Sequence, residues 1–195
     1  MKSTTRKLSI LASAAPLFNR AGYAGTSISD ILTATDLEKG GLYNHFASKE
    51  ELAVASFDYA FRQVDAYFTE ALANVESGLP RMRAYIDAFE RYIERPVVSG
   101  GCPIANATLE ADDALPFLRE RVAQAFEKMR GSVRHTFERG RAKGHFRADL
   151  DAEASADFVI AAVEGALLLS RGTRSGTPVT NVVTLLRAWV EGLAR

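Results

Sequence analysis

The chain has 195 residues, and its 24 basic and 24 acidic side chains give a formal net charge of +0. Zero net charge argues against a protein that coats nucleic acid without sequence preference. A single cysteine excludes an intramolecular disulfide, and no apolar run reaches the length of a membrane span. We therefore expect a cytoplasmic protein without membrane contact.

The first quarter of the chain predicts three helices and the start of a fourth. The first carries apolar residues at helical spacing within residues 10–18. The second begins at Ser27, where Ser-Ile-Ser-Asp has the pattern of a capping box. Asp36 marks a turn, because aspartate tolerates the left-handed conformation. A second capping box, at residues 48–51, opens a long helix.

The short helix after Asp36 is polar on one side and contains two adjacent glycines. The polar residues lie within two turns and are Lys39, Tyr43, Asn44 and His45. Gly40 and Gly41 each cost about 1 kcal/mol relative to alanine in a helix, so a compensating role is needed. One role is close approach of the backbone to a phosphate or a base edge of DNA. The alternative is close packing against a neighbouring helix. The two roles are compatible if one glycine faces inward and the other faces DNA.

Residues 22–52, GYAGTSISDILTATDLEKGGLYNHFASKEEL, resemble the DNA-binding region of the TetR/AcrR family of bacterial transcriptional repressors. The resemblance is strong over residues 6–55 and general beyond. Two positions depart from the family pattern: Asp36 replaces the usual turn glycine, and Glu38 stands where a serine or threonine often caps the recognition helix.

The resemblance implies a double-stranded DNA operator as partner and assigns roles to single residues. Those expected to contact backbone phosphates are Thr26, Ser27, Tyr43, His45 and Lys49. Those expected nearest the base edges are Lys39, Gly40, Gly41 and Asn44. Lys49 lies at a helix N-terminus, where free N–H groups already favour an anion. The alternatives are a hydrogen-bonded core histidine for His45 and solvated surface lysines for Lys39 and Lys49.

The remainder of the chain predicts further helices, beginning near Pro80, Pro103, Pro116, Asp151 and Pro178. No alternating pattern of strand length is present. The expected fold is all-α, with an N-terminal three-helix helix-turn-helix domain (residues 1–48) and a C-terminal helical domain for ligand binding and dimerisation (residues 49–195).

The last two predicted helices have apolar faces suited to self-association, because small residues permit close helix approach. The candidate interface residues are Phe158, Ala161, Ala162, Gly165, Leu169, Val182, Leu186 and Trp189. Two such helices from each chain build an intermolecular four-helix bundle, as the family usually does. The alternative is burial of these residues within one chain.

The middle helices carry aromatic residues that suit an apolar pocket for a small-molecule inducer. The candidate pocket residues are Tyr85, Phe89, Tyr92, Cys102, Asn106, Phe117, Phe126 and Met129. The family's mechanism is that an inducer shifts the dimer to a spacing that no longer fits the operator. The helix that begins near Lys49 is expected to transmit this shift, because its first residue contacts DNA and its far end meets the pocket. For each pocket residue alone, a plain core role is the alternative.

Cys102 suggests a second kind of signal. Pro103 fits the first position of a helix, so Cys102 becomes its N-cap, where the helix dipole favours the thiolate. Gly100 and Gly101 predict an accessible thiol, and some family members of the electrophile-responsive type have a similar Gly-Cys with an asparagine four residues on. A thiol-based electrophile or oxidant sensor is therefore one hypothesis, and a small buried apolar residue is the other.

The sequence gives no support for an enzyme and implies no cofactor or metal. The three histidines are widely separated, and no glycine-rich segment has the pattern of a phosphate loop. The alternative from another class is a helical small-ligand-binding protein without DNA binding, for which the acidic Asp36 and Glu38 are the only support.

Overall fold

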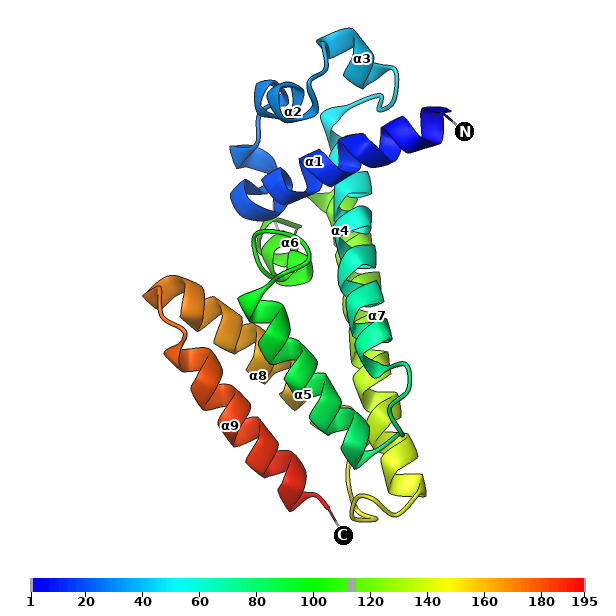
Figure 1. Ribbon diagram of the computed structural model, residues 1–195, viewed down its shortest axis with the longest axis vertical. Helices are drawn as coiled ribbons and strands as arrows, with labels where there is room; N and C mark the ends of the chain where they lie inside the picture. Colours follow the sequence, from blue (N-terminus) through cyan, green and yellow to red (C-terminus); the bar gives the residue numbers. More distant parts are fainter. Residues whose placement is uncertain (1, 112–114, 195) are drawn as a thin grey trace. The chain divides into compact units, whose positions relative to one another are not determined.

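The computed structural model describes residues 2–111 and 115–194, with the backbone alone for residues 2 and 3. Within those ranges the chain folds into nine α-helices (Figure 1). The one β pairing within them is an isolated antiparallel bridge between Phe146 and Ala194. The prediction of an all-α fold is confirmed.

Helices α2 and α4 to α9 begin within one residue of the predicted capping residues and prolines, whereas Glu38 before α3 makes no side-chain cap. They are α1 (Lys2–Gly25), α2 (Ile28–Thr35), α3 (Lys39–Tyr43), α4 (Lys49–Leu72), α5 (Leu79–Glu94), α6 (Pro103–Ala111), α7 (Pro116–Ala142), α8 (Ala152–Thr173) and α9 (Thr177–Gly192). Asp151 caps α8 by accepting hydrogen bonds from the backbone N–H groups of Glu153 and Ala154, at 3.0 and 3.1 Å. Proline stands in the first turn of α5 and α9, where its missing N–H costs nothing.

The chain forms two compact units that are interleaved in the sequence. The first comprises residues 1–65 and 97–125, and the second comprises residues 66–96 and 126–195. The boundaries fall within α4 and α7, so each of these helices contributes to both units. The division of the chain at residues 48 and 49 into DNA-binding and ligand-binding domains concerns function and stays a prediction.

In the first unit, α1, α2, α3 and the start of α4 close around a small apolar core. Its buried members, each at most 4% exposed, are Ile10, Leu11, Ala14, Ile31, Leu42, Phe46 and Leu52. Leu37 packs against this core and is partly buried. The core fixes α3, which is too short to be stable alone, on the outside of the unit.

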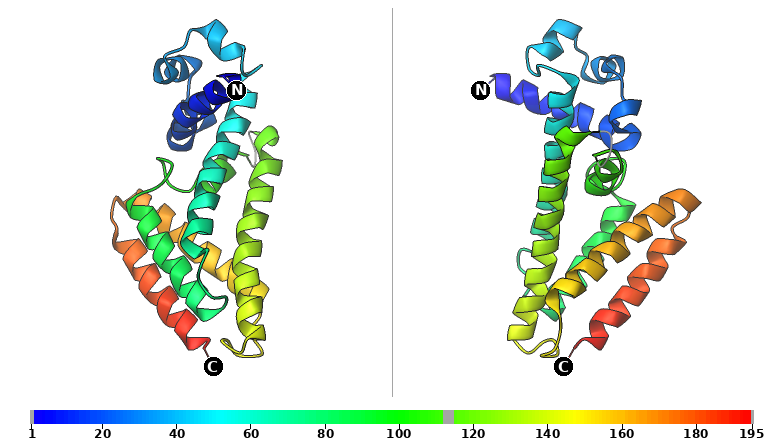
Figure 2. Two further views of the ribbon diagram at one scale, coloured as in Figure 1. Left: turned by 45° about the vertical axis from the view of Figure 1, so that its right-hand side comes forward. Right: turned by 180° about the vertical axis from the view of Figure 1, so that it is seen from behind.

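In the second unit, α8 and α9 run side by side, and α5 packs against α9 (Figures 1 and 2). Val159 and Val163 of α8 and Val183, Leu186 and Val190 of α9 are buried within the unit. Ion pairs also join α9 to α5, through Arg187 with Glu90 and Arg83 with Glu191. Because these charges are partly exposed, apolar packing contributes more to the stability of the unit than they do.

Candidate nucleic-acid interface

Helix α2 is fixed at both ends by the residues that the sequence singled out. The Ser27 hydroxyl accepts a hydrogen bond from the Asp30 backbone N–H at 3.1 Å, and the Asp30 carboxylate accepts one from the Ser27 N–H at 2.8 Å. This reciprocal pair is the predicted capping box. The Asp30 carboxylate also accepts from the Ser27 hydroxyl at 2.7 Å, and this bond, together with the one from the Ser27 backbone N–H, lowers the pKa of Asp30. Asp36 ends the helix in the left-handed conformation, with φ of 51°. The predicted turn is therefore confirmed without a glycine.

Helix α3 presents its polar side chains to solvent. Lys39, Tyr43 and Asn44 are exposed, and His45 is half-buried. Leu42, in contrast, is 1% exposed and anchors the helix to the core. The arrangement gives a short, firmly supported surface rich in hydrogen-bonding groups.

The two glycines of α3 differ in their surroundings. A Cβ atom added at Gly40 would meet no heavy atom within 4 Å, whereas one added at Gly41 would lie 3.2 Å from Cδ2 of Leu37. Gly41 therefore allows close packing inside the unit. Gly40 has no such packing reason within the described chain, and its approach to DNA stays a prediction.

The N-terminus of α4 is capped as predicted. The Ser48 hydroxyl accepts from the Glu51 N–H at 3.2 Å, and the Glu51 carboxylate accepts from the Ala47 N–H at 2.7 Å. The Lys49 ammonium is turned toward the protein: it donates to the Tyr23 carbonyl at 2.7 Å and lies 4.1 Å from the centre of the Tyr23 ring. A phosphate contact at Lys49 thus depends on its backbone N–H and not on a free side chain.

Thr26 also departs from the expected arrangement. Its side chain is 2% exposed, and its hydroxyl donates to the Gly22 carbonyl at 2.7 Å. The preceding turn covers Thr26, so its hydroxyl does not lie on an open surface. Ser27 is exposed, but its backbone N–H and its hydroxyl both donate to the Asp30 carboxylate, so a phosphate contact at Ser27 requires these bonds to be displaced.

Tyr23 connects several elements of the first unit. Its hydroxyl donates to the Glu50 carboxylate at 2.5 Å. This hydrogen bond, together with burial, raises the pKa of Tyr23 to about 12, and the same bond lowers the pKa of Glu50. The Tyr23 ring also contacts the Phe117 ring, with 5.4 Å between centroids. The sequence placed Tyr23 in a family pattern but gave it no role.

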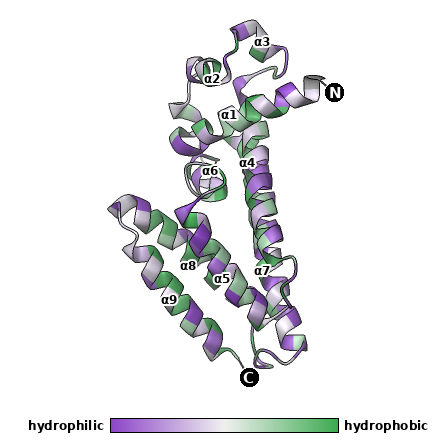
Figure 3. Ribbon diagram, in the orientation of Figure 1, coloured by the Kyte–Doolittle hydropathy of each residue, from purple (hydrophilic) through white to green (hydrophobic). Residues whose placement is uncertain are grey.

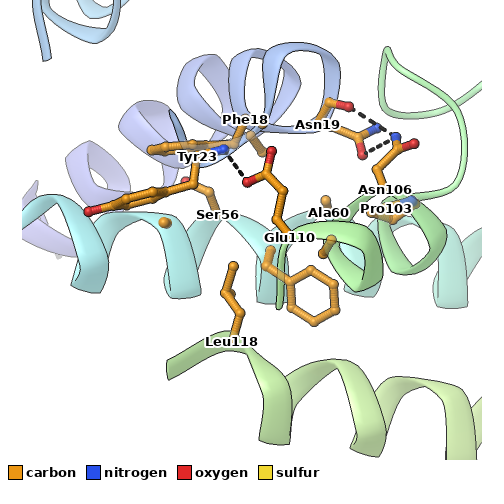
Figure 4. Close-up of a pocket in the computed structure, with 14 residues that line it drawn as sticks. Phe18, Asn19, Tyr23, Ser56, Ala60, Pro103, Asn106, Glu110 and Leu118 are labelled. Carbon is orange, nitrogen blue, oxygen red and sulfur yellow. Dashed lines mark hydrogen bonds between the residues drawn. The ribbon is translucent and has the colours of Figure 1, made fainter. Parts of the chain in front are cut away.

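A cavity of about 40 Å³ lies among α1, α4, α6 and the start of α7 in the first unit (Figure 4). Its lining includes Phe18, Ser56, Phe57, Asn106 and Glu110. Ser56 is 1% exposed and its hydroxyl has no hydrogen-bond partner among the described residues. A drug-sized ligand needs several hundred Å³, so this cavity has room for about one water molecule.

The residues expected to bind an inducer are distributed over both units. Asn106 lines the cavity, and Phe117 contacts Tyr23. Tyr85, Phe89 and Tyr92 are buried in the second unit, where Tyr85 and Tyr92 pack against Phe68. Phe126 and Met129 are half-buried there. Their grouping into one pocket stays a prediction.

Cys102 lies at the N-cap of α6 as predicted, since its carbonyl accepts from the Asn106 N–H at 3.1 Å. The prediction that its thiol is accessible is wrong: Cys102 is 8% exposed. The glycine-rich segment before it folds over α1, where Asn19 donates to the carbonyls of Ser99 and Gly101.

Helices α8 and α9 carry large exposed apolar side chains. Figure 3 shows hydrophobic residues along both helices. Of the predicted interface residues, Phe158 and Leu169 are 48% and 56% exposed. Ala161 is exposed, and Ala162, Gly165, Val182 and Trp189 are half-buried. Leu186 does not belong to this face: it is 2% exposed and packs within its own unit.

Two residues that sequence reasoning missed complete the face. Leu168 and Leu185 are 64% and 69% exposed. Leu185 lies three residues after Val182 and four before Trp189, so helical spacing alone was enough to include it. We refer to Phe158, Leu168, Leu169 and Leu185 as the α8–α9 apolar face.

Two family models match separate segments of the chain, and both describe tetracycline-repressor-like proteins. Residues 10–55 match the family "Bacterial regulatory proteins, tetR family", and residues 78–186 match "Tetracyclin repressor-like, C-terminal domain". The HTH-type transcriptional repressor DhaR of Mycobacterium sp. (strain GP1) is 28% identical over 170 residues, which cover 87% of this chain and 84% of DhaR. No helix in the described ranges is long and apolar enough to cross a membrane.

Solved structures of TetR-family regulators superpose on this chain over its whole length. A TetR transcriptional regulator from Chloroflexus aurantiacus J-10-FL superposes with a TM-score of 0.94 at 43% identity, covering 100% of this chain and 98% of that one. A TetR-family regulator from Cytophaga hutchinsonii superposes with a TM-score of 0.89 at 31% identity, covering 100% and 97%.

Proposed function

The chain belongs to the TetR family of bacterial transcriptional regulators, and from that premise we propose that it is a repressor released from its operator by a small-molecule inducer. It is a DNA-binding regulator and not an enzyme. Because bacterial operators lie in the cytoplasm, we place its action there. DhaR is named a repressor, which supports repression as the outcome of DNA binding.

The observation that carries the proposal is the exposed polar face of α3. Lys39, Gly40, Tyr43 and Asn44 form a surface without apolar cover, held in place by the buried Leu42. Such a surface suits the major groove, where phosphate bonds set the register and base-edge bonds carry sequence preference. We assign Lys39, Gly40 and Asn44 to the base edges. Tyr43, His45, Ser27 and the N-terminus of α4 are assigned to the phosphates.

A homodimer is proposed because the α8–α9 apolar face has no cover within its own unit. Large exposed apolar patches on a folded protein mark interaction sites. Pairing of α8 and α9 with a second copy covers the four side chains in a four-helix bundle. A two-fold dimer then reads an inverted repeat whose half-sites lie one helical turn, about 34–36 Å, or a multiple of that apart.

The experiment that tests the proposal is selection of bound fragments from a random DNA library by the purified protein. We expect an enriched inverted repeat, bound with an affinity that falls steeply as salt rises, because phosphate contacts release counterions. That fragment then serves as the probe in a screen for small molecules that release it. A folded, dimeric protein that enriches no sequence at low salt would instead support a ligand carrier without DNA binding.

A further inference from the structure

Helix α1 is broken one turn before its end. Gly22 has φ of 74° and ψ of 177°, values that no helical residue adopts. In a continuous helix, the Tyr23 N–H would donate to the Asn19 carbonyl four residues earlier. The break separates these two groups, and both lie in partly buried surroundings where an unpaired backbone group is costly.

Helix α6 supplies a new partner for each separated group (Figure 4). The Glu110 carboxylate accepts from the Tyr23 N–H at 2.7 Å, and the Asn106 side-chain amide donates to the Asn19 carbonyl at 2.9 Å. Asn106 and Glu110 are four residues apart and therefore lie on one face of α6. One turn of α6 thus replaces, with two side chains, the hydrogen bond that α1 lacks.

The break at Gly22 depends on glycine because of its positive φ. A Cβ atom added there would lie 1.6 Å from a Glu110 carboxylate oxygen, so the Glu110 side chain would have to move. Asn106 also donates to the Asn19 side-chain oxygen at 2.9 Å and to the Gly100 carbonyl at 2.8 Å. Asn106 thus holds the part of α1 before the break, and Glu110 holds the part after it.

The same tyrosine reaches the start of α4. Its carbonyl accepts from the Lys49 ammonium, and its hydroxyl donates to Glu50. Lys49 is the first residue of α4, where the free N–H groups of the first turn attract a phosphate. A continuous series of hydrogen bonds therefore leads from α6 through Tyr23 to the proposed phosphate-binding end of α4.

We propose that Asn106 and Glu110 clamp the broken end of α1 and thereby position the first turn of α4 on an operator phosphate. This inference rests on the proposed function, because it needs an operator. Glu110 and Asn106 are positioning residues, and neither touches DNA. A shift of α6 would displace Tyr23 and with it the phosphate-binding turn.

The test compares Glu110→Ala, Glu110→Gln and Asn106→Asp with the wild type, using the selected operator at several salt concentrations. Leu109→Ala, at a 78% exposed site on the same helix, is the matched control. Thermal unfolding shows that each variant is folded, and amide exchange by NMR reports whether the Tyr23 N–H has lost its partner.

For Glu110→Ala and Asn106→Asp we expect operator affinity to fall about tenfold, as for the loss of a charge-assisted contact. The slope of log affinity against log salt should stay that of the wild type, because the contact that is lost is made by a neutral backbone N–H and not by a Lys or Arg cation. Glu110→Gln keeps an acceptor oxygen and should bind within about twofold of the wild type. Leu109→Ala should match the wild type in both readouts.

A purely structural role would lower thermal stability and leave the operator affinity of the folded protein unchanged, so wild-type affinity in the folded Glu110→Ala and Asn106→Asp variants overturns the clamp. Wild-type exchange at the Tyr23 N–H in Glu110→Ala also overturns it. If the wild type itself binds no specific DNA, the proposed function fails, and the role of the clamp fails with it.

Discussion

Replacing Gly40 with alanine should change the stability of the folded chain and its affinity for DNA in opposite directions. The added methyl group meets no heavy atom within 4 Å, so the folded state accepts it without strain. Alanine is favoured over glycine in a helix by about 1 kcal/mol. For a chain of this length, a gain of that size corresponds to a rise in Tm of about 2–4 °C.

The same methyl group should weaken operator binding. If the backbone of α3 approaches the DNA at Gly40, the methyl group occupies space that a base edge or phosphate needs. Overpacking of a close contact costs about 1–3 kcal/mol, which corresponds to roughly a 5- to 150-fold loss of affinity. We therefore expect a variant that is more stable and binds DNA less tightly.

The assay pairs thermal unfolding with operator titration by fluorescence anisotropy. Gly41→Ala is the matched control for the stability measurement. Its added methyl group would lie 3.2 Å from Leu37, so we expect little or no rise in Tm for this variant. If Gly40→Ala binds the operator as tightly as the wild type, the backbone at Gly40 does not approach DNA, and the explanation given for this glycine fails.

Three further predictions follow from single side chains. Asn44→Ala should change the sequence preference at one operator position by about 1–3 kcal/mol, and a repeated library selection would show it; an unaltered preference would remove Asn44 from the base-reading set. Leu185→Asp should give a folded monomer by sedimentation, since Leu185 is 69% exposed, whereas a variant that remains dimeric would place the dimer contact elsewhere. Cys102 should resist a maleimide in the native protein and react in urea, as judged by mass spectrometry; rapid native labelling, with operator release that Cys102→Ser abolishes, would restore the sensor hypothesis.

Local features were predictable because neighbouring residues encode them. The capping boxes at Ser27 and Ser48, the turn at Asp36 and the prolines that open α5 and α9 all depend on contacts within a few residues. The polar face of α3 followed from the same kind of reasoning. These signals were sufficient for the class of fold and for the surface proposed to meet DNA.

Features that depend on long-range packing were not predictable. Asn19 and Asn106 are 87 residues apart, and no local pattern pairs them. The segment before the buried Cys102 is likewise held by Asn19, which lies 80 residues before Ser99 and 82 residues before Gly101.

The interleaving of the two units has a consequence for synthesis. Ala15 and Ala60 are buried together with Val98, so the first unit lacks part of its core until the segment beyond residue 96 is available. At a translation rate of about 5–20 residues per second, the 60 residues from 65 to 125 take roughly 3–12 s to emerge. Throughout that interval the nascent helices α1 to α4 expose surface that α6 later covers. A fragment that ends near residue 65 should therefore be a poor substitute for the full chain, and a chaperone has its best opportunity to bind the nascent chain during this delay.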